Sequence, residues 1–193
     1  MSCFSSHPPA PTTFPTLRFI GPDTRETMYL ENAQGVRTPI FALNINKHTK
    51  PSLSVYRIAP NGHQQPFFTS STSSMSGTSR INIHNREIKM EISYEGMQLR
   101  REFHGPMGKL GWYPAGMGSD QKLKDRNGTV LAKFDTRIDS GSAKEPQLSI
   151  LVQCDDYLTD LILATGLTVY MDAMKEKKQV SSAAEILGSV LGA

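Results

Sequence analysis

Residues 156–178 constrain the fold more than any other part of the chain, because they read as a helix that is apolar on every side. Acidic residues stand in its first turns and lysines in its last, which complements the helix dipole. Between Asp160 and Asp172 the 11 intervening residues carry no charge. At about 100° per residue their large apolar side chains point in all directions, so the helix must be buried all round, in protein or in a membrane.

The length of this segment favours enclosure by protein over insertion into a bilayer. The uncharged stretch spans about 16 Å at about 1.5 Å per residue, whereas a membrane-spanning helix needs about 20 residues. Thr165, Gly166 and Thr168 lie within the stretch and are poorly suited to contact with lipid. We therefore expect no transmembrane segment and a helix that the rest of the domain encloses.

Short β-like runs precede this helix. Each is bounded by Gly, Pro or Asn, and residues 87–93 alternate strictly between apolar and polar side chains. Asn127-Gly128 is a strong signal for a hairpin turn. Sequential strands of this kind predict a barrel or a sandwich, and the apolar helix selects the barrel. The expected fold is mainly β, an antiparallel β-barrel of about twelve short strands wrapped around a central apolar α-helix. The runs are 16–20, 26–30, 40–45, 53–59, 80–84, 87–93, 97–104, 110–113, 122–124, 129–135 and 147–152.

The barrel domain is expected to span residues 16–178. Residues 1–15 are rich in proline and predict a disordered tail, and 179–193 predict a short amphipathic helix because Ser182 and Glu185 form a capping box. The Ser/Thr-rich residues 69–79 predict a mobile surface loop, with a phosphorylated regulatory loop as the alternative.

Several features restrict the class of protein. The first residues show no secretory signal, and two cysteines, Cys3 and Cys154, fit a reducing compartment. We expect a cytoplasmic protein, with the inner membrane surface as the alternative location. A net charge of +3 is too small to indicate nucleic acid.

Three segments resemble the tubby C-terminal-like superfamily, which includes the tubby domain, the phospholipid scramblases and the LURP-one-related proteins. They are Trp112-Tyr113, the hairpin KLKDRNGTVLAKF at 122–134, and the acidic helix entry DDYLTDLILA at 155–164. The resemblance is closest in style to small fungal members without an assigned function. It implies a twelve-stranded barrel around a central helix. It implies no single activity, because some members bind phosphoinositides and others are linked to lipid scrambling.

Catalytic chemistry has little support in the sequence. The chain contains no nucleophile elbow, no HExxH, no CxxC and no phosphate loop, so we expect no enzyme and no cofactor. A hydrolase is the least supported class. His84 and His104 end predicted strands and could meet in space, but five histidines without ligand-like spacing predict no metal site.

Basic residues carry the functional prediction. Lys122, Lys124 and Arg126 alternate along one predicted strand and so share one face, while Arg100 and Arg101 lie on another strand. If these strands are neighbours, the five residues form a patch that binds anionic phospholipid or phosphoinositide headgroups. The simpler interpretation is a solvated barrel face. The alternative function is a protein-interaction scaffold that uses the Pro-rich tail and the C-terminal helix.

Overall fold

The computed structural model describes residues 16–20, 27–31, 35–46, 49–73, 76–95, 98–115, 120–135 and 146–191. Side chains are described throughout these ranges except in residues 16–20, at Glu95 and Gln98, and beyond Lys175 in the helix. The predicted tail, residues 1–15, lies outside these ranges. The elements are β1 (Thr16–Ile20), β2 (Thr27–Glu31), β3 (Arg37–Ile45), β4 (Leu53–Ile58), β5 (Gln64–Thr72), β6 (Ser79–Ile83), β7 (Arg86–Glu95), β8 (Gln98–Gly105), β9 (Gly108–Pro114), β10 (Gln121–Asp125), β11 (Val130–Asp135), β12 (Gln147–Ile150) and α1 (Asp156–Leu191).

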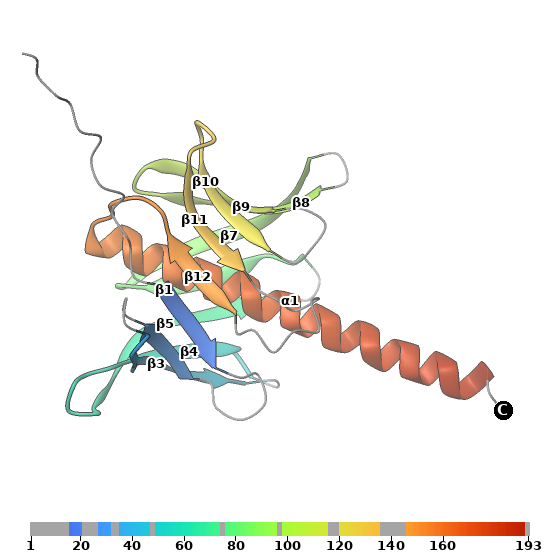
Figure 1. Ribbon diagram of the computed structural model, residues 1–193. Helices are drawn as coiled ribbons and strands as arrows, with labels where there is room; N and C mark the ends of the chain where they lie inside the picture. Colours follow the sequence, from blue (N-terminus) through green and yellow to red (C-terminus); the bar gives the residue numbers. More distant parts are fainter. Residues whose placement is uncertain are drawn as a thin grey trace, which may run out of the picture.

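Each strand pairs antiparallel with the next one along the chain, and β1 pairs with both β2 and β12. The pairings therefore form a continuous series, here called the strand ring (Figure 1). The turns follow the expected chemistry: Gly128 has a φ of +83°, and the two-residue turn between β6 and β7 places His84 and Asn85 at positive φ. The prediction of a mainly antiparallel β fold with one C-terminal helix is confirmed.

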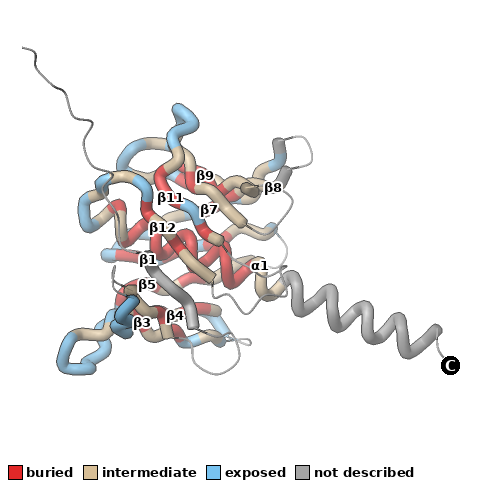
Figure 2. Tube along the Cα trace, in the orientation of Figure 1, coloured by how far each residue is buried: buried red, intermediate tan, exposed pale blue. Residues whose placement is uncertain are grey.

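Helix α1 supplies the centre of the core. Every residue from Asp160 to Asp172 is buried, as Figure 2 shows by the red segment of α1 among the strands. Leu161, Ile162 and Leu167 have no exposed surface. The predicted enclosure of the apolar segment by protein is therefore confirmed. Within the described part of the chain, no helix combines the length and the hydropathy needed to cross a bilayer.

The single tryptophan fixes the position of helix α1 against the strand ring. The Trp112 indole N–H donates to the Thr165 hydroxyl at 3.0 Å, and both residues are fully buried. The indole also lies against the backbone of Gly166, where an added Cβ would stand 3.1 Å from Trp112 Cζ2. The close approach of the strand ring to the helix, through the Trp112 indole, thus depends on a glycine at position 166.

Two predictions about the chain's organisation differ from the structure. The C-terminal residues 179–193 were expected to form a separate helix, but α1 continues without a break to Leu191. Ser, Ala and Glu fit a helix interior, and neither Gly nor Pro interrupts the sequence between Gly166 and Gly188. The capping-box pattern therefore lies inside a longer helix and does not begin a new one.

The second difference concerns the Ser/Thr-rich residues 69–79. The prediction of a loop is wrong at both ends, because β5 extends to Thr72 and β6 begins at Ser79. Hydroxyl side chains on the inner face are tolerated because Thr72 and Ser79 donate to the buried carboxylate of Asp172, at 2.8 and 3.1 Å. Mobility and phosphorylation of the remaining connection stay predictions.

Two buried carboxylates join the helix to the ring. Asp160, 7 % exposed, accepts from Arg57 on β4 at 2.7 Å and lies 2.9 Å from His84 Nε2. Asp172, 5 % exposed, is held by the hydroxyls of β5 and β6. Burial raises the pKa of Asp172, and the Thr72 hydrogen bond and the charge of Arg101 oppose that rise only in part.

Candidate functional site

The structure separates the two arginines of the predicted patch. Neighbouring residues of a strand face opposite sides, and Arg101 points inward, where it is 5 % exposed and its charge acts on Asp172. Arg100 is on the outer face of β8 and donates to Ser93 at 2.9 Å. Arg101 is therefore placed to balance a buried carboxylate, and its inclusion in a surface site was wrong.

Arg126 also differs from its predicted position. Strand β10 ends at Asp125, and Arg126 is exposed in the turn that follows. The Asp125 carboxylate accepts from the backbone N–H groups of Asn127 and Thr129, at 2.9 and 2.8 Å, and so shapes this turn. The strand alternation thus holds for Lys122 and Lys124 but ends before Arg126.

A compact group of basic side chains remains on the outer face of β8 to β11. In the strand register Tyr113 is opposite Lys122, and Lys122 is opposite Lys133. Arg101 is opposite Trp112, which makes Arg100 the neighbour of Tyr113 on the other side. We call Arg100, Lys122, Lys124 and Lys133, with Tyr113 among them, the basic cluster.

Tyr113 organises this cluster. The Arg100 guanidinium carbon lies 5.9 Å and the Lys124 ammonium 5.2 Å from the centroid of its ring. The ring leans over Gly111, where an added Cβ would stand 2.9 Å from Tyr113 Cε2. Glycine at position 111 therefore lets the tyrosine ring lie close to the sheet, beneath both cations.

The charge of the cluster is only partly balanced. Glu102 accepts from Lys109 and Ser93, each at 2.9 Å, and lies 3.5 Å from Arg100. Burial alone would raise the pKa of Glu102, but the bonds from Lys109 and Ser93 and the two positive charges lower it, so this carboxylate is ionised. No ion pair joins a described carboxylate to Lys122, Lys124 or Lys133.

Sequence reasoning missed Lys133 and Tyr113 as members of the cluster. The hairpin signal at Asn127-Gly128 contained the information for Lys133, because it places β10 and β11 side by side. The turn alone does not predict the register shift between Leu123 and Lys124. This shift decides that Lys122 is opposite Lys133.

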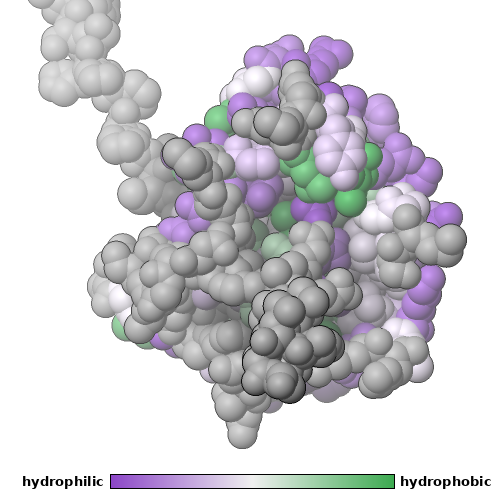
Figure 3. All heavy atoms as spheres, turned by 90° about the vertical axis from the view of Figure 1, so that its right-hand side faces the viewer, coloured by the Kyte–Doolittle hydropathy of each residue, from purple (hydrophilic) through white to green (hydrophobic). Residues whose placement is uncertain are grey.

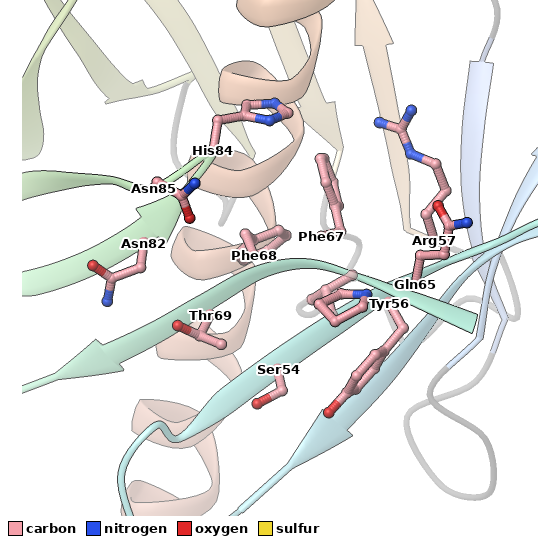
Figure 4. A pocket seen from close by; sticks show the side chains of 12 residues that line it. Ser54, Tyr56, Arg57, Gln65, Phe67, Phe68, Thr69, Asn82, His84 and Asn85 are labelled. Carbon is pink, nitrogen blue, oxygen red and sulfur yellow. The ribbon is translucent and has the colours of Figure 1, made fainter.

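A second feature, a pocket of about 530 Å³, lies over β4, β5 and β6 (Figure 4). Arg57 and His84 stand at one end of it, on either side of Phe67. The Arg57 guanidinium carbon lies 4.9 Å from the centroid of the Phe67 ring, and Phe41 stacks on that ring at 4.8 Å. The guanidinium is therefore held by a carboxylate and by an aromatic stack.

Among the described residues, neither a metal site nor an activated nucleophile is present. His84 contacts Asp160, whereas His104 is opposite Lys109 on β9. No group of three His, Cys, Asp or Glu side chains in the described ranges is arranged to hold a metal ion. Burial, aided by the charge of Asp155, raises the pKa of the Cys154 thiol and makes it a weak nucleophile.

Comparison of the chain with protein-family models, with curated proteins and with solved structures gave no significant match. The functional assignment therefore depends on the geometry of the basic cluster and of the pocket.

Proposed function

We propose that this protein is a non-enzymatic intracellular binding module that attaches to anionic phospholipid surfaces, including those that carry phosphoinositides. The basic cluster is the contact surface. The observation that carries the proposal is the convergence of three lysines without a described carboxylate partner beside Tyr113, on one outer face of the sheet.

The expected attachment is weak and salt-sensitive. A basic residue near an anionic membrane contributes about 1 kcal/mol, and the effect decays within a Debye length of about 10 Å. Lys122, Lys124 and Lys133 together supply about 3 kcal/mol, which is roughly a hundredfold in partitioning. Tyr113 suits the same surface, because its ring is amphipathic and belongs at the level of the headgroups.

The resemblance of three segments to the tubby C-terminal-like superfamily supports a second part of the proposal. We propose that the strand ring is a closed barrel and that the chain is a distant tubby-like protein. The pairing of β1 with both β2 and β12, and the apolar helix among the strands, support this. The interaction-scaffold alternative depends on residues 1–15 and on the end of α1, whose side chains lie outside the described residues.

The test is sedimentation with vesicles of phosphatidylcholine, with and without phosphatidylserine or a phosphoinositide, at low and high salt. Wild type should sediment with the anionic vesicles at low salt only. The triple variant Lys122→Gln, Lys124→Gln, Lys133→Gln should lose roughly a hundredfold in partitioning. Its melting temperature should stay close to wild type, because these side chains are on the outer face.

A matched control removes the same charge from another face. Lys50, Arg80 and Lys89 line a polar hollow of about 580 Å³ over β5, β6 and β7. Their triple change to Gln alters the net charge equally and should reduce sedimentation much less. Equal losses in both variants would mean attraction by net charge without a site, and indifference of wild type to anionic vesicles would overturn the proposal altogether.

A further inference from the structure

Two lysines of the basic cluster form a pair of like charges across neighbouring strands. Lys122 on β10 is directly opposite Lys133 on β11. Both point outward, because their chain neighbours Leu123 and Ala132 are fully buried. Opposite side chains have Cβ atoms about 4.5–5.5 Å apart, and like charges in this position destabilise a sheet. No described carboxylate forms an ion pair with either ammonium group, so the fold carries this repulsion without compensation.

A second basic pair in the same sheet is compensated. Arg80 on β6 is directly opposite Lys89 on β7. The Arg80 guanidinium lies 2.8 Å from the Glu87 carboxylate, and the Lys89 ammonium pairs with Glu91. The chain thus balances one basic pair with acids at nearby positions and leaves the other unbalanced. Departures of this kind from a local rule are expected at functional sites.

The anion that fits the Lys122–Lys133 pair must accept hydrogen bonds from two ammonium groups at once. A phosphomonoester has three terminal oxygens and a charge of about −1.5 to −2 at neutral pH. A phosphodiester exposes two such oxygens and carries one negative charge. Because charge-assisted hydrogen bonds are roughly twice as strong as neutral ones, the additional oxygen and the additional charge both favour the monoester.

The surroundings of the pair leave recognition to the headgroup. On the β9 side the pair is bounded by Tyr113, which is opposite Lys122 and whose ring centroid lies 5.2 Å from the Lys124 ammonium. Figure 3 views the molecule from the side on which α1 leaves the strand ring, and the described residues there are mainly hydrophilic. That side offers little apolar surface to a bilayer, so selectivity depends on charged contacts with headgroup oxygens.

We infer that the Lys122–Lys133 pair binds the terminal phosphomonoester of a lipid headgroup, as in phosphatidate or a phosphoinositide, in preference to phosphodiester headgroups such as phosphatidylserine. The inference rests on the proposed attachment to anionic membranes and adds the headgroup class to it. Lys124 and Arg100 supply attraction that does not distinguish between headgroups.

The experiment is sedimentation of the full chain with vesicles that differ in headgroup but share one zeta potential. Each contains phosphatidylcholine with phosphatidylserine, phosphatidylinositol, phosphatidate or phosphatidylinositol 4-phosphate. Partitioning onto the phosphomonoester lipids should be about tenfold stronger than onto the phosphodiester lipids. Equal partitioning onto all four would overturn the choice of a phosphomonoester and leave membrane attachment intact.

Soluble probes separate the chemistry of the phosphate from its source. Glycerol 3-phosphate should shift the amide resonances of β10 and β11 more than glycerophosphocholine, which is a phosphodiester. Equal shifts would contradict the selectivity of the pair. If a protein that ignores every vesicle still binds glycerol 3-phosphate, the lipid source and the proposed function both fail, while the pair stands as a phosphate site.

Variants separate the pair from net charge. Lys133→Glu places an acid opposite Lys122, so it should raise the urea midpoint and remove the preference of about tenfold. Lys89→Glu, opposite Arg80, changes the net charge equally and should weaken partitioning onto every vesicle while keeping the preference. A folded Lys133→Glu protein that keeps the preference would refute the site, and a lowered urea midpoint would refute the repulsion on which it rests.

Discussion

Replacing Thr165 by Val should destabilise the fold through one buried hydrogen bond. The Trp112 indole N–H and the Thr165 hydroxyl are both fully buried and 3.0 Å apart. Valine keeps the shape of threonine but accepts no hydrogen bond, so it leaves the N–H unpaired at a cost of about 1–3 kcal/mol. The hydroxyl's bond to the Leu161 carbonyl is a lesser loss, because that carbonyl is already in the helix. Burying a methyl group in place of a hydroxyl offsets part of the cost, so the net loss should be about 1–2 kcal/mol.

A double-mutant cycle with Trp112→Phe isolates this bond from packing effects. Phenylalanine has no N–H, so Thr165→Val should cost nothing in the Trp112→Phe background, and the coupling free energy should be about 1–2 kcal/mol. Urea unfolding followed by far-ultraviolet circular dichroism suits all four proteins, because Trp112 is the only tryptophan and its variants lose fluorescence. An equal cost of Thr165→Val in both backgrounds would refute the reasoning.

Further predictions concern the same core. Leu163→Asp should prevent soluble folding, because position 163 is 4 % exposed and a carboxylate there would lose its water. Leu163→Met should fold, and a soluble Asp variant with normal melting would contradict the enclosed helix. Gly166→Ala should lower the urea midpoint, because a Cβ 3.1 Å from Trp112 costs about 1–3 kcal/mol, whereas the better helix propensity of alanine stabilises the fold by only about 1 kcal/mol. A raised midpoint would show that the indole moves to make room for the methyl group. Burial raises the pKa of Asp172 above its ordinary 3.8, so the folded state holds this proton more tightly than the unfolded state. As the pH rises from 3.8 through the raised pKa, wild type should therefore lose stability relative to Asp172→Asn. Urea unfolding at a series of pH values measures this difference, and a constant difference would contradict the prediction. Burial likewise raises the pKa of Tyr170 to about 12, so one of the six tyrosines should ionise late in an absorbance titration, and stability should fall as pH rises from 10 to 12.

The sequence predicted the parts of the fold that local patterns determine. Alternating side chains and turn residues located every strand except β5, because strand period and turn chemistry are properties of neighbouring residues. The helix was predicted as enclosed because its apolar residues, such as Leu161 and Leu167, surround the whole axis. A helix that is apolar on every side must be buried, whichever part of the protein covers it.

Strand β5 shows where local patterns fail. Its Ser and Thr residues predicted a loop because hydroxyls usually face water, and only the folded ring brings Asp172, about a hundred residues away, opposite Thr72 and Ser79. Arg101 was assigned to the surface for the same reason. Its direction depends on which face of β8 meets the helix, and that is a property of the sheet.

The candidate sites divide in the same way. Lys122 and Lys124 share a face by the period of a strand, which the sequence alone determined. Their juxtaposition with Arg100, Tyr113 and Lys133 depended on strand register, and a register shift moves every side chain relative to its neighbours. The pocket depended on tertiary structure entirely. Arg57, His84 and Asp160 come from β4, a turn and the helix. Only the packing of the helix against the sheet brings them together, and a buried carboxylate is costly without such partners.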